Sequence, residues 1–126
     1  MKTMSRKSHA ILDYGSVILL FASPWLFNFN NVPAAKTIVM VSAILILVMS
    51  LMTNYEAGVA KMVPMRMHLS ADVLLGIFLA ASPWLFNFSG ETYTFHLLMG
   101  VVAILAGVFT TKESLKRSYN QESMAR

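Results

Sequence analysis

The sequence predicts an all-α protein: a four-helix transmembrane bundle made of two tandem two-helix repeats. Three observations predict it, namely low charge with high hydrophobicity, four apolar stretches of membrane-spanning length, and an octapeptide that occurs twice. Of the 126 residues, 56% are hydrophobic and 13% are charged, which is about half the charged fraction of a soluble domain. The mean hydropathy is +0.61. We therefore expect lipid, rather than water, to surround most of the chain.

The composition excludes several classes of function. Without cysteine, the chain cannot hold a disulfide framework or a cysteine-ligated zinc or iron–sulfur site. The net charge of +4 comes from basic residues scattered at the ends of the apolar stretches, whereas nucleic-acid binding requires a basic patch. The sequence contains no nucleophile–base motif, phosphate loop or dinucleotide fingerprint. We therefore predict that the protein is not an enzyme and has no nucleic-acid partner.

Four apolar stretches, each about 20 residues long, predict the four helices. A helix of that length rises about 30 Å, which matches the hydrocarbon core of a bilayer. The second stretch is the purest, because no charged residue occurs between Ile38 and Met52. The expected spans are residues 10–29, 34–52, 69–88 and 93–111.

The basic residues predict the orientation in the membrane. Nine of the ten lysines and arginines precede the first span, lie between the second and third, or follow the fourth, and only Lys36 lies on the other side. By the positive-inside rule, both termini are then cytoplasmic. We expect a multi-pass protein of the cytoplasmic (inner) membrane, with the lipid bilayer as its first partner.

An internal repeat divides the chain. The octapeptide at residues 22–29 returns unchanged at residues 81–88, which is 59 positions later. We interpret this as the tandem duplication of a two-helix hairpin. Because two helices return the chain to its starting side, the repeats are expected to be related by a pseudo-two-fold axis along the membrane normal. The predicted units are a first repeat at 1–60, a second repeat at 61–114 and a polar cytoplasmic tail at 115–126.

Each octapeptide carries a Ser-Pro-Trp motif near the end of the first helix of its hairpin. The motif residues are Ser23, Pro24 and Trp25 in the first repeat, and Ser82, Pro83 and Trp84 in the second. With these motifs, and with segments 53–58, 63–72 and 96–100, the sequence resembles the SPW repeat family of small bacterial and archaeal membrane proteins. The resemblance covers residues 6–111 and implies a four-helix membrane protein, but no particular activity.

The Ser-Pro-Trp motif has a structural interpretation. Each proline frees the carbonyl four residues before it, and in lipid a freed carbonyl needs a donor, which the neighbouring serine can supply. The tryptophans and the phenylalanines after them are expected to form an aromatic belt at the outer headgroups. The alternative is a kink that opens a pocket or a gate. The expected belt residues are Trp25, Phe27, Phe29, Trp84, Phe86 and Phe88.

Two His-x3-Asp pairs, His9 with Asp13 and His68 with Asp72, are the candidate functional residues. They align at the repeat offset, and residues four apart share one face of a helix. Buried carboxylates in an apolar span are costly and indicate a function or a partner. Two histidines and two aspartates can form a tetrahedral zinc-type site, and the spacing is similar to that of the cation-diffusion-facilitator zinc transporters. Glu56 follows the second span on the same side and is a further candidate.

Two interpretations of these pairs remain open. In the first, each aspartate pairs with a nearby group such as Tyr55, Lys7 or Arg66 and ties the helix starts together. The protein would then have a structural role, oligomerising or docking on a larger membrane complex. In the second, the pairs bind or transport protons or a zinc-like divalent metal, the one cofactor that the sequence suggests. The sequence favours the structural role.

Small residues at helical spacing predict close contacts between helices, because they let backbones approach in lipid. Such contacts can lie within the bundle or between two copies. His96 has no counterpart in the first repeat, and we expect it to hydrogen-bond a neighbouring loop on the outer side. The candidate contact residues are Gly76, Gly100, Ala103 and Gly107.

Overall fold

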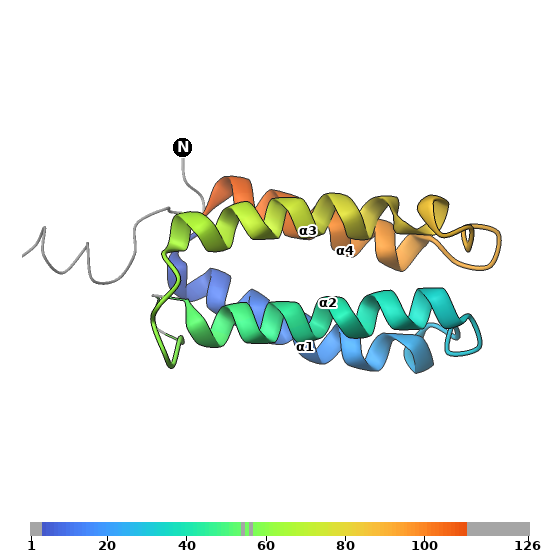
Figure 1. The fold of residues 1–126 in the computed structure, drawn as a ribbon, viewed down its shortest axis with the longest axis horizontal. Coiled ribbons are helices and arrows are strands. Elements are labelled where there is room, and N and C mark those ends of the chain that lie inside the picture. The colour runs from blue at the N-terminus through green and yellow to red at the C-terminus, as the bar shows by residue number, and fades with distance from the viewer. Residues whose placement is uncertain (1–3, 54, 56, 111–126) are drawn as a thin grey trace, which may run out of the picture.

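The fold is known from a computed structural model, which describes residues 4–53, 55 and 57–110 (Figure 1). The predicted all-α class is confirmed. The helices pack as two pairs, α1 with α2 and α3 with α4, and the main contact between the pairs is made by α2 and α3 (Figure 1). The four helices are α1 (Arg6–Leu26), α2 (Pro33–Met52), α3 (Met65–Leu85) and α4 (Thr94–Phe109).

Length and composition make this a multi-pass membrane protein. Helices α1, α2 and α3 are each long and apolar enough to cross a membrane. Helix α4 is equally apolar but has 16 residues, fewer than the 19 of the predicted span, because the chain becomes extended at Thr110. Large apolar side chains such as Ile18, Leu74 and Leu98 lie exposed on the outside, where a hydrocarbon environment accommodates them.

Helices α1 and α3 begin four residues before the apolar stretches that predicted them. Polar residues extend α1 because Ser5 caps it: the Ser8 N–H donates to the Ser5 hydroxyl at 3.1 Å. Helix α3 begins directly after Pro64. A side-chain cap therefore sets the start of α1, whereas α3 has no side-chain cap and starts after a proline. The consequence is that His9 and His68 lie in the first turns of their helices.

The same two helices end three residues before the predicted ends. Asn28 and Asn87 adopt a left-handed backbone, with φ of 57° and 59°, a conformation that asparagine tolerates better than most residues. This turn directs the next side chains inward, so Phe29 and Phe88 are 1% and 2% exposed. The prediction that these two belong to an outer aromatic belt was therefore wrong. The exposed aromatics of the two motifs are Trp25, Phe27, Trp84 and Phe86.

The serines of the motif satisfy the carbonyls that the prolines free. The hydroxyl of Ser23 donates to the Leu20 carbonyl at 2.7 Å, and that of Ser82 donates to the Leu79 carbonyl at 2.7 Å. Both serines are fully buried. The motif thus ends a helix in an apolar environment without leaving a carbonyl unpaired.

Small residues bring α3 and α4 into close contact. A Cβ atom added to Gly100 would lie 2.5 Å from both the Ala80 nitrogen and the Gly76 oxygen, and one added to Gly107 would lie 2.7 Å from the Leu69 oxygen. Contacts this short leave no room for a side chain. These glycines therefore face a helix of the same chain and are not open to a second copy.

His96 joins the two helix pairs at the end opposite the α2–α3 connection. Its Nε2 donates to the Ala35 carbonyl in the first turn of α2 at 3.0 Å. The ring lies between Phe29 and Phe88, with centroid distances of 5.0 and 4.9 Å. The sequence predicted an outer-side histidine bonded to a loop, but His96 is completely buried and its partner is a helix.

Candidate metal centre

Four ionisable side chains converge where the beginnings of α1 and α3 meet. His9 and Asp13 come from α1, and His68 and Asp72 come from α3. Each offers one potential ligand atom, and these four atoms lie within 4.8 Å of one another. All four residues are buried: the histidines are completely buried, and Asp72, the most exposed of the four, has 8% of its surface exposed. The two repeats therefore contribute one pair each to a single cluster, which we call the quartet.

The imidazole Nε2 atoms of the quartet point at the carboxylates. The Nε2 of His9 lies 3.2 Å from Asp13 Oδ1 and 2.8 Å from Asp72 Oδ2. The Nε2 of His68 lies 3.0 Å from Asp13 Oδ2 and 3.4 Å from Asp72 Oδ2. Yet within the described part of the chain, neither Nε2 nor Asp72 Oδ2 makes a hydrogen bond of acceptable geometry. Three buried polar atoms thus face a common centre without a proper partner.

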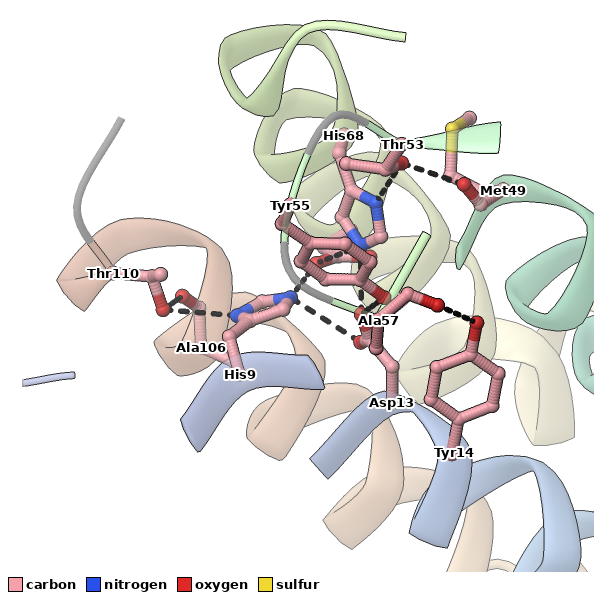
Figure 2. Close-up of polar contacts among 11 residues, drawn as sticks. His9, Asp13, Tyr14, Met49, Thr53, Tyr55, Ala57, His68, Ala106 and Thr110 are labelled. Carbon is pink, nitrogen blue, oxygen red and sulfur yellow. Dashed lines mark hydrogen bonds and ion pairs between the residues drawn. The ribbon is translucent and has the colours of Figure 1, made fainter. Parts of the chain in front are cut away.

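Two threonines hold the other side of each imidazole, as Figure 2 shows. The His9 Nδ1 lies 2.9 Å from the Thr110 hydroxyl, which itself donates to the Ala106 carbonyl at 2.6 Å. The His68 Nδ1 lies 2.6 Å from the hydroxyl of Thr53, the residue that follows α2. The arrangement is reciprocal, because the last helix of each hairpin supplies the threonine that holds the histidine of the other hairpin.

These threonines determine which imidazole nitrogen carries a proton. The Thr53 hydroxyl donates to the Met49 carbonyl at 2.5 Å, so its oxygen can only accept from His68 Nδ1–H, and the same holds for Thr110 and His9. In a neutral ring the Nε2 then has a free lone pair. A lone pair and a carboxylate repel each other, so a cation has to lie between them, either a proton on each Nε2 or a metal ion.

Tyr55 covers the quartet from the connection between α2 and α3 (Figure 2). The side chain is fully buried, and its hydroxyl donates to Asp13 Oδ2 at 2.9 Å. Burial, followed by the nearby Asp13 carboxylate, raises the pKa of the Tyr55 phenol, so this group stays protonated and remains a donor. Tyr55 was one of the partners predicted for the aspartates, while Glu56 lies outside the described residues.

Asp72 borders two hollows beside the quartet. One is a small cavity of about 30 Å³, lined by both aspartates and otherwise mainly by apolar side chains such as Leu20 and Leu79. It has room for about one or two water molecules. The other is a groove of about 170 Å³ between α2 and α3, lined by Leu45 and five further residues including Asp72. Asp72 is thus the carboxylate of the quartet that lines both hollows.

Sequence reasoning did not identify the two threonines. The repeat offset of 59 aligns Thr53 with Lys112, whereas the residue with the equivalent contact is Thr110. In the second hairpin the threonine comes two residues earlier than the offset of 59 predicts, so aligning the repeats at that offset does not pair Thr53 with Thr110. A threonine directly after the last helical residue of each hairpin, Met52 and Phe109, is the signal that would have revealed them.

Comparison with known protein families places the chain in a described family. The sequence family described as SPW repeat domain matches residues 7–110, which include every member of the quartet and both threonines. Neither the curated proteins nor the solved structures yield a match to this chain. The resemblance predicted from the two Ser-Pro-Trp motifs is therefore confirmed.

Proposed function

The chain belongs to the SPW repeat family, and we propose that this member binds a divalent metal ion of the zinc class inside the membrane. The ligands are His9, Asp13, His68 and Asp72. One observation carries the proposal: two completely buried Nε2 atoms, whose Nδ1 atoms are each held by a threonine, converge with two carboxylates at distances of 2.8 to 3.4 Å.

The spacing of the donor atoms supports a four-coordinate ion. Bonds of about 2.0–2.1 Å to nitrogen and oxygen separate the ligands of a tetrahedral zinc ion by about 3.3 Å. In the quartet, each Nε2 lies 2.8 to 3.4 Å from an oxygen of either aspartate, with Asp13 using a different oxygen toward each histidine, and one atom from each residue lies within 4.8 Å of the other three. We propose that the side chains move toward the common centre when the ion binds. The threonines that hold Nδ1 act as the outer partners that metal-binding histidines require.

Charge balance supports a divalent ion. Two carboxylates and one divalent cation sum to zero, which is the inexpensive state in a low-dielectric environment. Four protein ligands leave no open position for a substrate, unlike catalytic zinc sites. We therefore propose a binding or carrier function and no catalysis, with Asp72 as the ligand nearest a route of exchange.

Metal titration of the purified protein in nanodiscs tests the proposal. We expect wild type to bind one Zn²⁺ per chain, and Asp72→Asn to weaken binding by at least about 100-fold, since a charged ligand is lost. Glu91→Gln is the matched control, because it removes an exposed carboxylate at the opposite end of the bundle. If wild type binds no zinc, or if both variants lose affinity equally, the proposal fails.

The second candidate is a structural role, and the observation that favours it is the reciprocal bonding of the two hairpins at this site. With a proton on each Nε2, the quartet would be a neutral set of ion pairs tying α1 to α3. On this proposal the folded unit oligomerises or docks on a larger membrane complex. Unfolding measured with and without zinc separates the two functions, because a metal site gains stability with zinc and an ion-pair set does not.

We further propose that the protein lies in the cytoplasmic (inner) membrane with both termini inside. The pairing of Met4 with Thr110 puts both ends of the described chain at the same end of the bundle, which agrees with the distribution of basic residues. The quartet would then lie near the cytoplasmic face. Labelling of the single-cysteine variants Lys7→Cys and Lys36→Cys tests this orientation. An impermeant reagent added to intact cells should label the Lys36→Cys variant only, and labelling of the Lys7→Cys variant would contradict the proposal.

A further inference from the structure

We propose that Tyr55 determines the metal selectivity of the quartet by restricting Asp13 to one coordinating oxygen. This inference rests on the proposed metal-binding function and deepens it, because it concerns which ions the site prefers. Tyr55 would be a positioning residue that acts through Asp13 and has no contact with the metal.

The two carboxylates of the quartet differ in their hydrogen bonds. Asp13 Oδ2 accepts the Tyr55 hydroxyl at 2.9 Å and lies 3.0 Å from His68 Nε2, which fixes the rotation of the carboxylate. Oδ1 faces His9 Nε2 at 3.2 Å and is the Asp13 oxygen that the Tyr55 hydroxyl leaves to the centre of the quartet. Asp72 Oδ2 has no hydrogen bond among the described residues. The repeats are therefore symmetric in their ligands but differ in how firmly each carboxylate is oriented.

Tyr55 is itself firmly held. Its backbone N–H donates to the Thr53 carbonyl at 3.0 Å, and its carbonyl accepts from the Lys61 ammonium group at 2.8 Å. Its ring packs on His68, with the centroids 5.5 Å apart. A phenol fixed by backbone, side-chain and ring contacts can impose an orientation on Asp13, whereas a mobile one could not.

Coordination chemistry gives this hydrogen bond its consequence. Zinc accepts four ligands and single carboxylate oxygens, whereas manganese and calcium favour six or more oxygens. A carboxylate that can offer only one oxygen penalises the second group of ions. Loss of the Tyr55 hydroxyl would free Asp13 to chelate through both oxygens and would relax that penalty.

The experiment compares Zn²⁺ and Mn²⁺ affinities of wild type, Tyr55→Phe and Tyr14→Phe in nanodiscs. Tyr14→Phe is the matched control, because it also removes a tyrosine hydroxyl from this region, one that donates to the Ala57 carbonyl at 2.8 Å and not to the quartet. We expect Tyr55→Phe to lower the ratio of zinc to manganese affinity about tenfold, the size expected for loss of an outer partner. Tyr14→Phe should leave the ratio unchanged.

The outcomes separate this inference from the proposed function. If wild type binds no zinc, the proposed function itself fails. If wild type binds zinc but Tyr55→Phe weakens both metals equally, or changes the ratio no more than Tyr14→Phe, Tyr55 is only structural and the inference is overturned. If the Tyr55→Phe variant does not fold, a measurement on wild type alone tests the inference. Wild type loaded with Co²⁺ should show the intense visible absorption of a four-coordinate site. A weak six-coordinate spectrum would refute the restriction of Asp13 to one coordinating oxygen.

Discussion

Substitution of Gly100 by alanine should destabilise the protein by forcing α3 and α4 apart. The added Cβ would lie 2.5 Å from the Ala80 nitrogen, 2.5 Å from the Gly76 oxygen and 2.6 Å from the Ala80 Cβ. Ordinary contacts need about 1 Å more, and backbone atoms cannot move aside as a side chain can, so the overpacking should cost about 1–3 kcal/mol. Alanine also favours the helix over glycine by about 1 kcal/mol, which partly hides this cost.

A second glycine in the chain removes that ambiguity. Gly15 lies within α1, and a Cβ added there meets no atom within 4 Å, so Gly15→Ala gains the same helix preference without the overpacking. The difference in unfolding free energy between the two variants therefore isolates the overpacking, about 1–3 kcal/mol. Reversible unfolding by SDS titration in bicelles measures this difference in free energy, and native mass spectrometry reports the oligomeric state of each variant. If Gly100→Ala is as stable as Gly15→Ala but loses a dimer mass, the glycines mediate contact between copies and the reasoning is wrong.

Three further predictions concern the bonds around the quartet and the helix ends. Thr110→Val should weaken zinc binding about 10–100-fold, because His9 loses the acceptor that orients its ring; unchanged zinc calorimetry would exclude that role. Ser23→Ala should lower the unfolding free energy by about 1 kcal/mol, because the carbonyl freed by Pro24 loses its donor, and adding Pro24→Ala should restore most of the loss in the same SDS assay. Zinc affinity should fall as the pH is lowered, because the metal needs both Nε2 lone pairs and competes with protons for them; a pH-independent affinity in titrations of wild type would contradict ligation by histidine.

Much of the fold could be predicted because the relevant signals are local. Hydrophobicity over about 20 residues reports whether a helix can lie in lipid, and an exact repeat of eight residues reports a duplicated hairpin. The boundaries were less certain, because they depend on capping and turns. Ser5 extends α1 beyond its apolar stretch, and the left-handed Asn28 ends the helix early, which turned Phe29 from a predicted surface residue into part of the core.

The candidate site was predictable in its ligands but not in its assembly. The spacing of His9 and Asp13, repeated at His68 and Asp72, placed each pair on one helix face. Nothing in the sequence indicated that the two faces meet, since contact between α1 and α3 depends on how whole hairpins pack. Thr110 illustrates the limit most clearly, because it bonds a histidine 101 positions away.

The sequence alone therefore determined the medium, the helix number, the duplication and the four potential ligands, because composition, periodicity and repetition are properties of the chain itself. Only the tertiary structure decided that the four ligands share one centre, that two threonines orient the imidazoles from the opposite hairpin, and that the glycines of α3 and α4 face each other. These are distances between segments far apart in the chain, and they are fixed by the packing of whole helices, which no local pattern encodes.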